Sequence, residues 1–374
     1  MDRRDFIKHS FMATAASACS SLFPVPALAS APPKRILVLG GSLFVGPALV
    51  DAALAAGHSV TLFNRGVTNP NLFPYLEKLR GFRSVNAAEE NFSALGTREW
   101  DAVVDVWPYH PEMAVSAAKV LKSRTKHYLY VSSIAAYEAD EYAKSGINEN
   151  ATLASWTGPE RIYKRGKAES ERQLNALIGN KLTIVRPGPI KGDRDPGTED
   201  LSVWLLRAQA GKKHIGPGDG NEHVQIVDVK DVARFLVLAI DQSIYGTFNL
   251  TGRPMSFREF LDGCKAATHS EAEFLWIPQG FLHQKGLDPQ GLEHGGGGGY
   301  FPLWHPEPEN RGLFQISSQK AFQAGWHPRP FDETVSDTLI YLTSLDPTVF
   351  SWSDYLDSAK EAQVIGEWER SIKR

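Results

Sequence analysis

Three side chains that could move a proton occur at a spacing that such chemistry would use. Ser133 follows an apolar, β-branched stretch, Tyr163 comes thirty residues later, and Lys167 four residues after that. The segment 157–160 (TGPE) is typical of a capped helix start, which would place Tyr163 and Lys167 one turn apart on one face. A phenol has a pKa of about 10, and a nearby ammonium lowers it toward neutral pH. We predict that Lys167 activates Tyr163 while Ser133 binds the same substrate oxygen; a chance surface Tyr–Lys pair is the alternative.

A glycine-rich segment upstream has the position of a dinucleotide-binding loop. Leu39–Gly46 (LGGSLFVG) lies between a predicted strand and a predicted helix. Glycines there let the chain turn and let the helix pack closely, so that a pyrophosphate lies on free N–H groups at a helix N-terminus. Leu43 stands where the usual pattern has a glycine, and its Cβ would push the pyrophosphate outward. The predicted cofactor contacts in the loop are Gly40, Gly41, Ser42, Phe44, Val45 and Gly46.

The end of the second predicted strand bears on which dinucleotide binds. An NAD site usually has Asp or Glu here, on the ribose hydroxyls, whereas an arginine accommodates a 2′-phosphate. This chain has Asn64 and Arg65, and neither is acidic. We therefore favour NADP over NAD, with both residues as cofactor contacts. The alternative is that Arg65 stacks on adenine or faces solvent.

Short apolar runs rich in β-branched residues alternate with helical stretches from Lys34 to Arg186. The runs are too short and too continuously apolar for half-exposed antiparallel strands, so they are typical of buried parallel ones. This alternation implies right-handed crossovers and a doubly wound parallel sheet, the α/β Rossmann fold. The predicted strands are 35–40, 59–64, 102–106, 127–132 and 182–186, and the predicted helices are 46–57, 111–123 and 159–178.

The alternation weakens after Arg186, which indicates a second part of the chain. We predict a nucleotide-binding domain over 34–190 and about 225–250, with 225–233 and 246–250 returning to the sheet. A smaller, C-terminal substrate-binding lobe would comprise about 191–224 and 251–374. Five consecutive glycines at 295–299 predict a flexible loop, because such a run holds no fixed backbone cheaply.

These motifs together resemble the extended branch of the short-chain dehydrogenase/reductase superfamily, the NAD-dependent epimerase/dehydratase group. Thr183–Ile190 is similar to that family's strand and proline turn beside the nicotinamide. Gln225–Asp231 is similar to its return from the second lobe, and Gly246–Leu250 to its last sheet strand. The resemblance covers about 34–250. It implies that Ser133, Tyr163 and Lys167 form the catalytic triad and that Tyr163, Lys167 and Pro187 also contact the cofactor.

Two departures point to an atypical subgroup of that family. Leu43 in the glycine loop and the Asn64–Arg65 strand end look more like isoflavone-reductase-like proteins and chloroplast RNA-binding relatives. The substrate therefore cannot be inherited from the sugar epimerases.

Further candidates stand on segments that should face the cofactor edge. Trp107 and His110 follow the strand over 102–106; we predict Trp107 as a cofactor contact and His110 as a second acid/base or substrate ligand, with a structural histidine as the alternative. Trp304 is expected in the core rather than stacked on a ligand. The histidines lack metal-ligand spacing, so no metal is predicted. The candidate substrate contacts are His110, Ala135, His223 and Gln225.

Composition narrows the classes of partner. The 374 residues carry a formal net charge of −3, with no basic stripe, so we predict a small-molecule substrate and no nucleic acid. No apolar run beyond the N-terminus reaches the roughly 20 residues that cross a bilayer, so no integral membrane segment is expected in the mature protein. A homodimer through paired helices is what the resemblance implies.

The N-terminus predicts a twin-arginine signal peptide over 1–29. Arg3 and Arg4 precede a mildly apolar, Ala/Ser-rich stretch, and Ala27–Ala29 offers a small-residue cleavage site. The alternative is that the arginine pair occurs by chance in a leader that is not used, so that the protein stays in the cytoplasm. Cys19 could instead be lipidated. Removal of the predicted signal peptide leaves Cys264 as the single cysteine, so no disulfide can form within the chain. The lack of a disulfide fits export of an already folded protein to the periplasm or beyond.

Three functions remain open from the sequence. The first is an epimerase or dehydratase with tightly bound NAD(P), acting on a hydroxyl-bearing small molecule such as a sugar or glycoside. Outside the cytoplasm no nicotinamide pool regenerates the cofactor, so a redox-neutral cycle is favoured. The second is a cytoplasmic NADPH-dependent reductase of a carbonyl or activated double bond. The third is a non-catalytic or RNA-binding relative, which the net charge and the Ser133–Tyr163–Lys167 group disfavour.

Overall fold

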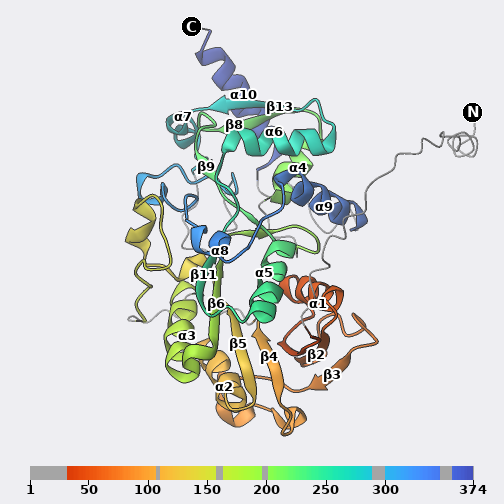
Figure 1. Ribbon diagram of the computed structural model, residues 1–374. Helices are drawn as coiled ribbons and strands as arrows, with labels where there is room; N and C mark the ends of the chain where they lie inside the picture. Colours follow the sequence, from red (N-terminus) through yellow and green to blue (C-terminus); the bar gives the residue numbers. More distant parts are fainter. Residues whose placement is uncertain are drawn as a thin grey trace, which may run out of the picture. The chain divides into compact units, whose positions relative to one another are not determined.

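The computed structural model describes residues 32–106, 110–156, 163–195, 201–288, 300–345 and 356–373. From Pro33 onward the chain forms one compact unit, drawn in Figure 1. The division of this unit into a nucleotide-binding domain and a substrate-binding lobe stays a prediction. The predicted leader, Trp107, the first turn of the predicted helix at 159 and the glycine run lie outside the described residues.

Seven parallel strands form the central sheet, in the order β11-β6-β5-β4-β1-β2-β3. The predicted Rossmann fold and its five strands are confirmed. The sequence did not indicate β3, because three of its four residues (EKLR) are charged and all four are exposed or half-exposed at the sheet edge. The strands are β1 (Arg35–Leu39), β2 (Ser59–Asn64), β3 (Glu77–Arg80), β4 (Trp100–Asp105), β5 (Thr125–Val131), β6 (Leu182–Pro187) and β11 (Gly246–Leu250).

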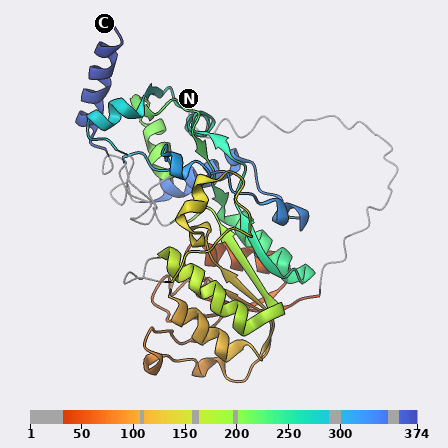
Figure 2. The same cartoon turned by 90° about the vertical axis from the view of Figure 1, so that its left-hand side faces the viewer.

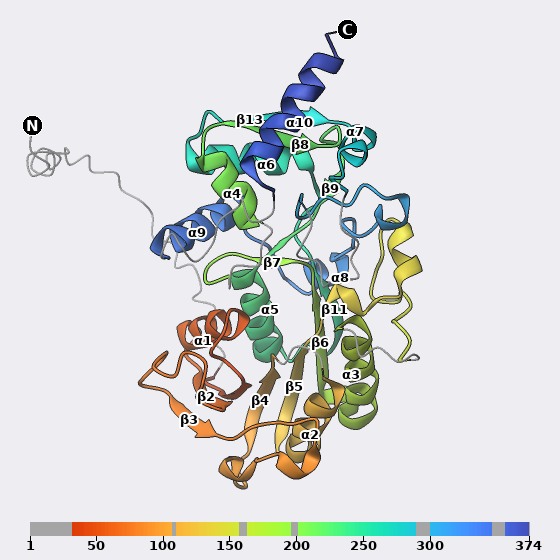
Figure 3. The same cartoon turned by 180° about the vertical axis from the view of Figure 1, so that it is seen from behind.

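Helices cover both faces of this sheet, which explains the unbroken apolar strands. Alternate residues of β1 point to opposite faces: Ile36 and Val38 pack under one pair of helices, and Leu37 and Leu39 under the other. The first pair is α1 (Val45–Ala55) and α5 (Val229–Gln242), and the second is α2 (Pro111–Leu121) and α3 (Tyr163–Ile178), as Figures 1 and 3 show.

The expectation that 225–233 returns to the sheet is wrong. Only Val227–Asp228 (β10) is extended, and it pairs with β7 (Ile190–Lys191) outside the main sheet. Asp228 then caps α5 by accepting a hydrogen bond from the backbone N–H of Lys230 at 2.7 Å. An aspartate at this position starts a helix, and the apolar residues that follow it bury one helical face against the sheet.

The C-terminal lobe has a hydrophobic cluster of its own. Trp204 packs edge-on against Phe257 and lies nearly parallel to Phe301, while Trp304, as expected, is fully buried. Two short sheets frame it, β8 with β13 in parallel and β9 with β12 antiparallel. The elements are α4 (Leu201–Gln209), β8 (Lys213–Pro217), β9 (His223–Val224), β12 (Met255–Ser256), α6 (Phe257–Thr268), β13 (Glu273–Ile277), α7 (Gln279–Gln284), α8 (Gln319–Gln323), α9 (Phe331–Ser344) and α10 (Ser358–Ser371).

Short 3₁₀ turns complete the chain; η3, directly after β5, matters most for the site because it carries Ser133 at its start. Figure 2 shows α3, in yellow-green, running beside the strands. Among the described helices none is both long and apolar enough to cross a membrane. The 3₁₀ turns are η1 (Ala87–Glu89), η2 (Ser93–Leu95), η3 (Ile134–Ala136), η4 (Ala139–Ala143), η5 (Gly179–Lys181) and η7 (Pro308–Asn310).

Candidate active site

The glycine loop between β1 and α1 is built for close approach of backbone to backbone. Gly40 and Gly41 have φ of +111° and +84°, which side chains with a Cβ rarely adopt. A Cβ on Gly46 would lie 2.5 Å from the Cα of Gly41, so the first turn of α1 rests directly on the loop. Phe44, at the N-cap, makes no side-chain cap to α1. The loop therefore leaves the helix N-terminus without a side-chain cap, as a pyrophosphate site requires.

Leu43 and the other predicted loop contacts lie on this turn. The Leu43 side chain is 55% exposed rather than folded into the loop. The backbone N–H of Gly46 donates to the carbonyl of Leu43 at 3.1 Å, which closes the turn. Ser42 also belongs to it, since its carbonyl accepts from the Asn69 side chain at 2.9 Å.

Asn64, at the end of β2, makes three structural hydrogen bonds. Its side-chain N–H₂ donates to the Gly40 carbonyl at 2.9 Å, and its Oδ1 accepts from the Gly66 N–H at 3.0 Å and from Arg80 at 2.6 Å. Arg65 is exposed beside it. Arg80 is a residue that sequence reasoning missed, because it lies at the end of the unpredicted strand β3. Two guanidinium groups thus flank the end of β2, next to the glycine loop.

Ser133, Tyr163 and Lys167 are brought together where β5 ends. Ser133 begins η3, its Oγ accepting from the Ala135 N–H at 3.1 Å, and it shares a hydrogen bond with the Tyr163 side chain. Tyr163 and Lys167 lie one turn apart on α3, and the Lys167 Nζ is 5.8 Å from the centre of the Tyr163 ring. The spatial arrangement expected from the spacing is therefore present.

Lys167 does not lower the pKa of the Tyr163 phenol as expected. Burial raises the pKa of Tyr163, and the hydrogen bond with Ser133 opposes that rise. The side chain is still 41% exposed, so water reaches part of the ring. Lys167 is buried instead: its Nζ donates to the Val131 carbonyl at 2.5 Å and lies 4.8 Å from the Tyr130 ring centre. Burial lowers its pKa to about 7.

Charged groups beneath the triad limit that fall in the pKa of Lys167. The carboxylates of Asp105, at the end of β4, and Glu171, on α3, raise it, while Arg83 lowers it further. Arg83 and Asp105 form a buried ion pair with Nη1 2.9 and 2.8 Å from the two carboxylate oxygens, and the Tyr128 hydroxyl donates to Asp105 at 3.2 Å. Sequence reasoning had not singled out these acidic residues.

The other predicted cofactor and substrate contacts lie on several different elements and differ in how exposed they are. His110 is half-buried at the N-cap of α2, Ala135 lies within η3, and Pro187 ends β6 opposite Leu250. His223 is exposed on β9, with its Nδ1 3.2 Å from the side-chain nitrogen of Gln315. Trp107 lies outside the described residues.

Gln225 cannot serve as the predicted substrate contact in this conformation. It is buried, its side-chain N–H₂ donates to the carbonyls of Gly252 and Ile316 at 2.8 and 2.9 Å, and its Oε1 accepts from the Ile316 N–H at 3.0 Å. Its amide is thus occupied by backbone groups and ties the lobe together.

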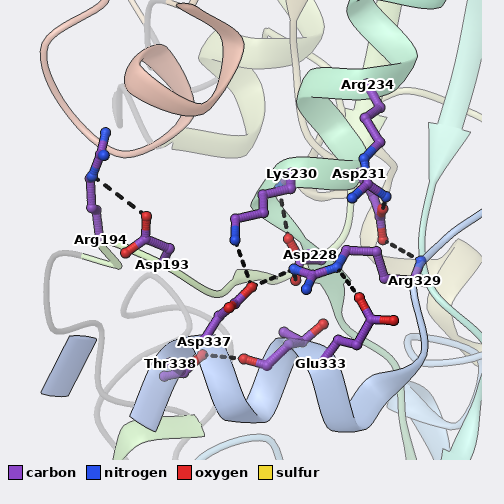
Figure 4. Close-up of polar contacts among 11 residues, drawn as sticks. Asp193, Arg194, Asp228, Lys230, Asp231, Arg234, Arg329, Glu333, Asp337 and Thr338 are labelled. Carbon is purple, nitrogen blue, oxygen red and sulfur yellow. Dashed lines mark hydrogen bonds and ion pairs between the residues drawn. The ribbon is translucent and has the colours of Figure 1, made fainter. Parts of the chain in front are cut away.

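A second charged group lies at the start of α5 and is shown in Figure 4. Arg329 donates from Nη1 to Asp228 and Asp337 at 2.9 and 2.5 Å, and from Nε to Glu333 at 2.8 Å. It borders a cavity of about 530 Å³. Because three carboxylates engage this guanidinium, we interpret the group as a tie between α5 and α9. Within the described ranges, no three His, Cys, Asp or Glu side chains gather as metal ligands would.

A doubly wound parallel sheet, with a glycine loop after its first strand and a Ser–Tyr–Lys group at its carboxyl edge, defines a dinucleotide-binding protein of the short-chain dehydrogenase/reductase type. Comparison with known families agrees. Residues 36–251 match the NAD dependent epimerase/dehydratase family, and the chain belongs to that family. The resemblance of the sequence to the epimerase/dehydratase family is confirmed.

Three known proteins illustrate what the chain is similar to. It is 28% identical over 263 residues to the chloroplast stem-loop binding protein of 41 kDa b of Arabidopsis thaliana, and 29% identical over 237 residues to 2′-dehydrokanamycin reductase of Streptomyces kanamyceticus. These matches cover 65% and 61% of this chain, and each spans 65% of the relative. The fold is similar to the crystal structure of UDP-glucose 4-epimerase with UDP-glucose from Thermotoga maritima, with a TM-score of 0.59 and 19% identity over 83% of this chain and 98% of the other.

We predict that Gly46→Ala weakens dinucleotide binding. Its Cβ would lie 2.5 Å from backbone that cannot move cheaply, so the loop must shift. We expect a loss of about 1–3 kcal/mol in the free energy of unfolding, measured in urea, and weaker binding of NADPH and NADH, measured by fluorescence. Gly280→Ala is the control, because a Cβ there meets open space. Unchanged affinity in Gly46→Ala would show that the loop holds no cofactor.

We predict that Lys167→Met stabilises the protein most at low pH. The pKa of Lys167 is about 7 in the folded chain against 10.5 ordinarily, so the unfolded chain binds more protons between these values and wild-type stability rises with pH there. Each unit of depression is about 1.4 kcal/mol, so the variant should gain a few kcal/mol below pH 7.

The measurement is thermal unfolding from pH 6 to pH 10. The advantage of Lys167→Met should shrink as the pH approaches 10.5. Lys212→Met, at an exposed position, should show no such trend. A difference that is constant with pH would mean that the buried amine keeps an ordinary pKa.

Proposed function

We propose that this chain is an NAD(P)-dependent epimerase- or dehydratase-type oxidoreductase that acts on a hydroxyl-bearing small molecule. The observation that carries the proposal is the hydrogen-bonded pair of Ser133 and Tyr163, with Lys167 beside the phenol, at the same carboxyl edge as the glycine loop. Family membership and the fold agree with it. A sugar or glycoside is the proposed substrate class.

The glycine loop fits a dinucleotide, because a Cβ at Gly40, Gly41 or Gly46 would clash with neighbouring protein atoms and open the tight turn that sets the loop against the N-terminus of α1. Bound NAD(P) would supply a hydride acceptor and donor. The residues of the chain move the proton. Ser133 would hydrogen-bond the substrate oxygen, and Tyr163 would take its proton as the carbon-bound hydrogen leaves as hydride, giving a carbonyl. Returning the hydride to the opposite face of the carbonyl, and the proton to its oxygen, gives an epimer. Loss of water before the hydride returns gives a dehydrated product instead.

The protonation states of Tyr163 and Lys167 favour the oxidative and the reductive half-reactions to different extents. The raised pKa of Tyr163 favours the neutral phenol, which donates a proton to a carbonyl oxygen in the reductive half. The oxidative half needs the phenolate, and the Lys167 ammonium beside the ring is the charge that favours it. At a pKa of about 7, Lys167 carries that charge in only part of the molecules at neutral pH.

We propose export through the twin-arginine pathway to the periplasm or beyond, on the strength of Arg3, Arg4 and the stretch that follows them. No nicotinamide pool regenerates the cofactor there, so a cycle that returns the hydride to the same molecule is the chemistry that can turn over.

An NADPH-dependent reductase is the second candidate function. The likeness to 2′-dehydrokanamycin reductase favours it, as do Arg65 and Arg80 at the end of β2 and β3. It would work in the cytoplasm, with the leader unused. Binding of a nucleic-acid stem-loop, the property in the name of the Arabidopsis relative, is disfavoured by the net charge of −3.

We predict that Tyr163→Phe abolishes most hydride transfer. The mature protein should carry a nucleotide that mass spectrometry identifies, and candidate sugars should change its absorbance at the reduced-nicotinamide band. Losing the proton carrier should slow that change by about 10²–10⁴-fold. Tyr245→Phe is the matched control, because Tyr245 is similarly exposed but lies just before β11. Wild-type protein with neither bound nucleotide nor affinity for one would rule out the proposed function.

Arg65→Ala and Arg80→Ala test the choice of dinucleotide. We expect Arg65→Ala to weaken NADPH by about tenfold, the worth of a charge-assisted hydrogen bond, and to leave NADH unchanged. Arg80→Ala should weaken both, because Arg80 also holds Asn64 and thereby the loop. Arg98→Ala, an exposed arginine paired with Glu77 on β3, is the control for loss of charge. An unchanged NADPH-to-NADH ratio in Arg65→Ala would contradict the preference for NADP.

A further inference from the structure

A buried carboxylate lies directly below the proton-carrying group. Glu171 is on α3, one turn after Lys167 and two turns after Tyr163, so the three side chains share one helical face. It is completely buried. The hydroxyl of Ser132, the residue before Ser133, donates to Glu171 Oε1. One carboxylate thus joins the end of β5 to the helix that carries the phenol and the ammonium.

Arg186 on β6 holds that carboxylate from the other side. Its Nε lies 3.1 Å from both oxygens of Glu171, and its Nη2 lies 2.6 Å from Oε2. Its Nη1 donates to the Tyr137 hydroxyl at 3.0 Å, and that hydroxyl donates to Asn249 Oδ1 on β11 at 2.7 Å. A single network of hydrogen bonds therefore links α3 to β5, β6, β11 and the turn after η3.

The same carboxylate acts on the charge of Lys167. The groups that face the Lys167 amine are Glu171 and Tyr163 on its own helix, Asp105 on β4 and Arg83 after β3, with the Tyr130 ring from β5. Asp105 raises the pKa of this amine most and Glu171 comes next, and each carboxylate is partly offset by its own guanidinium partner, Arg83 or Arg186. Glu171 is therefore one of two carboxylates that oppose the effect of burial on this amine.

We propose that Glu171, oriented by Arg186, is the positioning residue of this site: it fixes Ser133 against α3 and favours the ammonium form of Lys167 next to Tyr163. The inference rests on the proposed function for its consequence in catalysis, but the arrangement itself is independent of any substrate.

A gain in folding stability alone does not explain why the chain has the buried Glu171–Arg186 ion pair. Buried ion pairs lose about as much in desolvation as they gain in attraction, and apolar replacements are often neutral or stabilising. Removing one partner, in contrast, leaves an uncompensated buried charge and costs several kcal/mol. The pair is therefore tested both by a single and by a double neutral substitution.

The test follows the titration of Lys167 directly. Protein is labelled with ¹³C at lysine Cε, and the Lys167 signal is identified by its loss in Lys167→Met. In wild-type protein its midpoint should lie near pH 7. In Glu171→Gln it should fall by about half to one pH unit, because a nearby opposite charge has been removed. The double variant Glu171→Gln with Arg186→Gln, which leaves no unpaired buried charge, should show a smaller fall, because the charge of Arg186 partly offsets that of Glu171. It keeps the test valid if the single variant does not fold.

Glu361→Gln is the matched control. Glu361 is an equally buried carboxylate, on α10, paired with His214 and Arg207 in the lobe. Its loss should cost stability but leave the Lys167 midpoint unchanged. A midpoint within 0.2 pH unit (about the error of such a titration) of wild type in the folded double variant would overturn the inference.

Binding of NADPH and NADH is measured on the same samples. Wild-type protein that binds neither dinucleotide would defeat the proposed function, whatever the lysine titration shows. Wild-type protein that binds one of them, while the double variant keeps the wild-type midpoint, would defeat only the positioning role of Glu171. The two failures are thus distinguishable.

Discussion

All seven strands of the central sheet run parallel, and their carboxyl ends therefore meet at one edge. That constraint decides where this chain can do chemistry. The glycine loop after β1, Asn64 at the end of β2, Ser133 after β5 and Pro187 at the end of β6 are far apart in sequence. They share that edge because no strand of this sheet runs the other way. Ligands bind outside the carboxyl ends of open α/β sheets for the same reason.

Buried charge is concentrated beneath this edge. The pairs Arg83–Asp105 and Glu171–Arg186 each place a carboxylate within hydrogen-bonding distance of a guanidinium, below a lysine that has lost most of its contact with water. In such surroundings a charge acts over a longer range than in water, so two carboxylates can oppose the effect of burial on Lys167. The two buried ion pairs thus act on the inner side of the site, while the Tyr163 side chain on its outer side is in contact with water.

The chain keeps the family's architecture and changes its details. Leu43 replaces a loop glycine and is exposed. Asn64 donates a hydrogen bond from its side-chain N–H₂ to the Gly40 carbonyl and so holds the loop. An acidic residue has no N–H to donate, and its carboxylate would instead be available to bind the ribose. The lobe forms its own aromatic cluster, and its Gln225 is engaged by backbone. We expect relatives as distinct as a reductase and a stem-loop binding protein to differ most in this lobe, which we predict to bind the substrate.

The sequence by itself determined the Rossmann sheet, the position of the glycine loop and the Ser133–Tyr163–Lys167 group, because these depend on local patterns: apolar runs, glycines and a helical spacing of four. It did not reveal the polar edge strand β3 and its Arg80, or helix α5, whose apolar start was interpreted as a strand. Nor did it reveal that Lys167 is buried, or that Glu171 meets Arg186 and Ser132. Those features were decided by tertiary structure alone, since burial and ion pairing depend on which distant segments pack together, and no local pattern of residues encodes that.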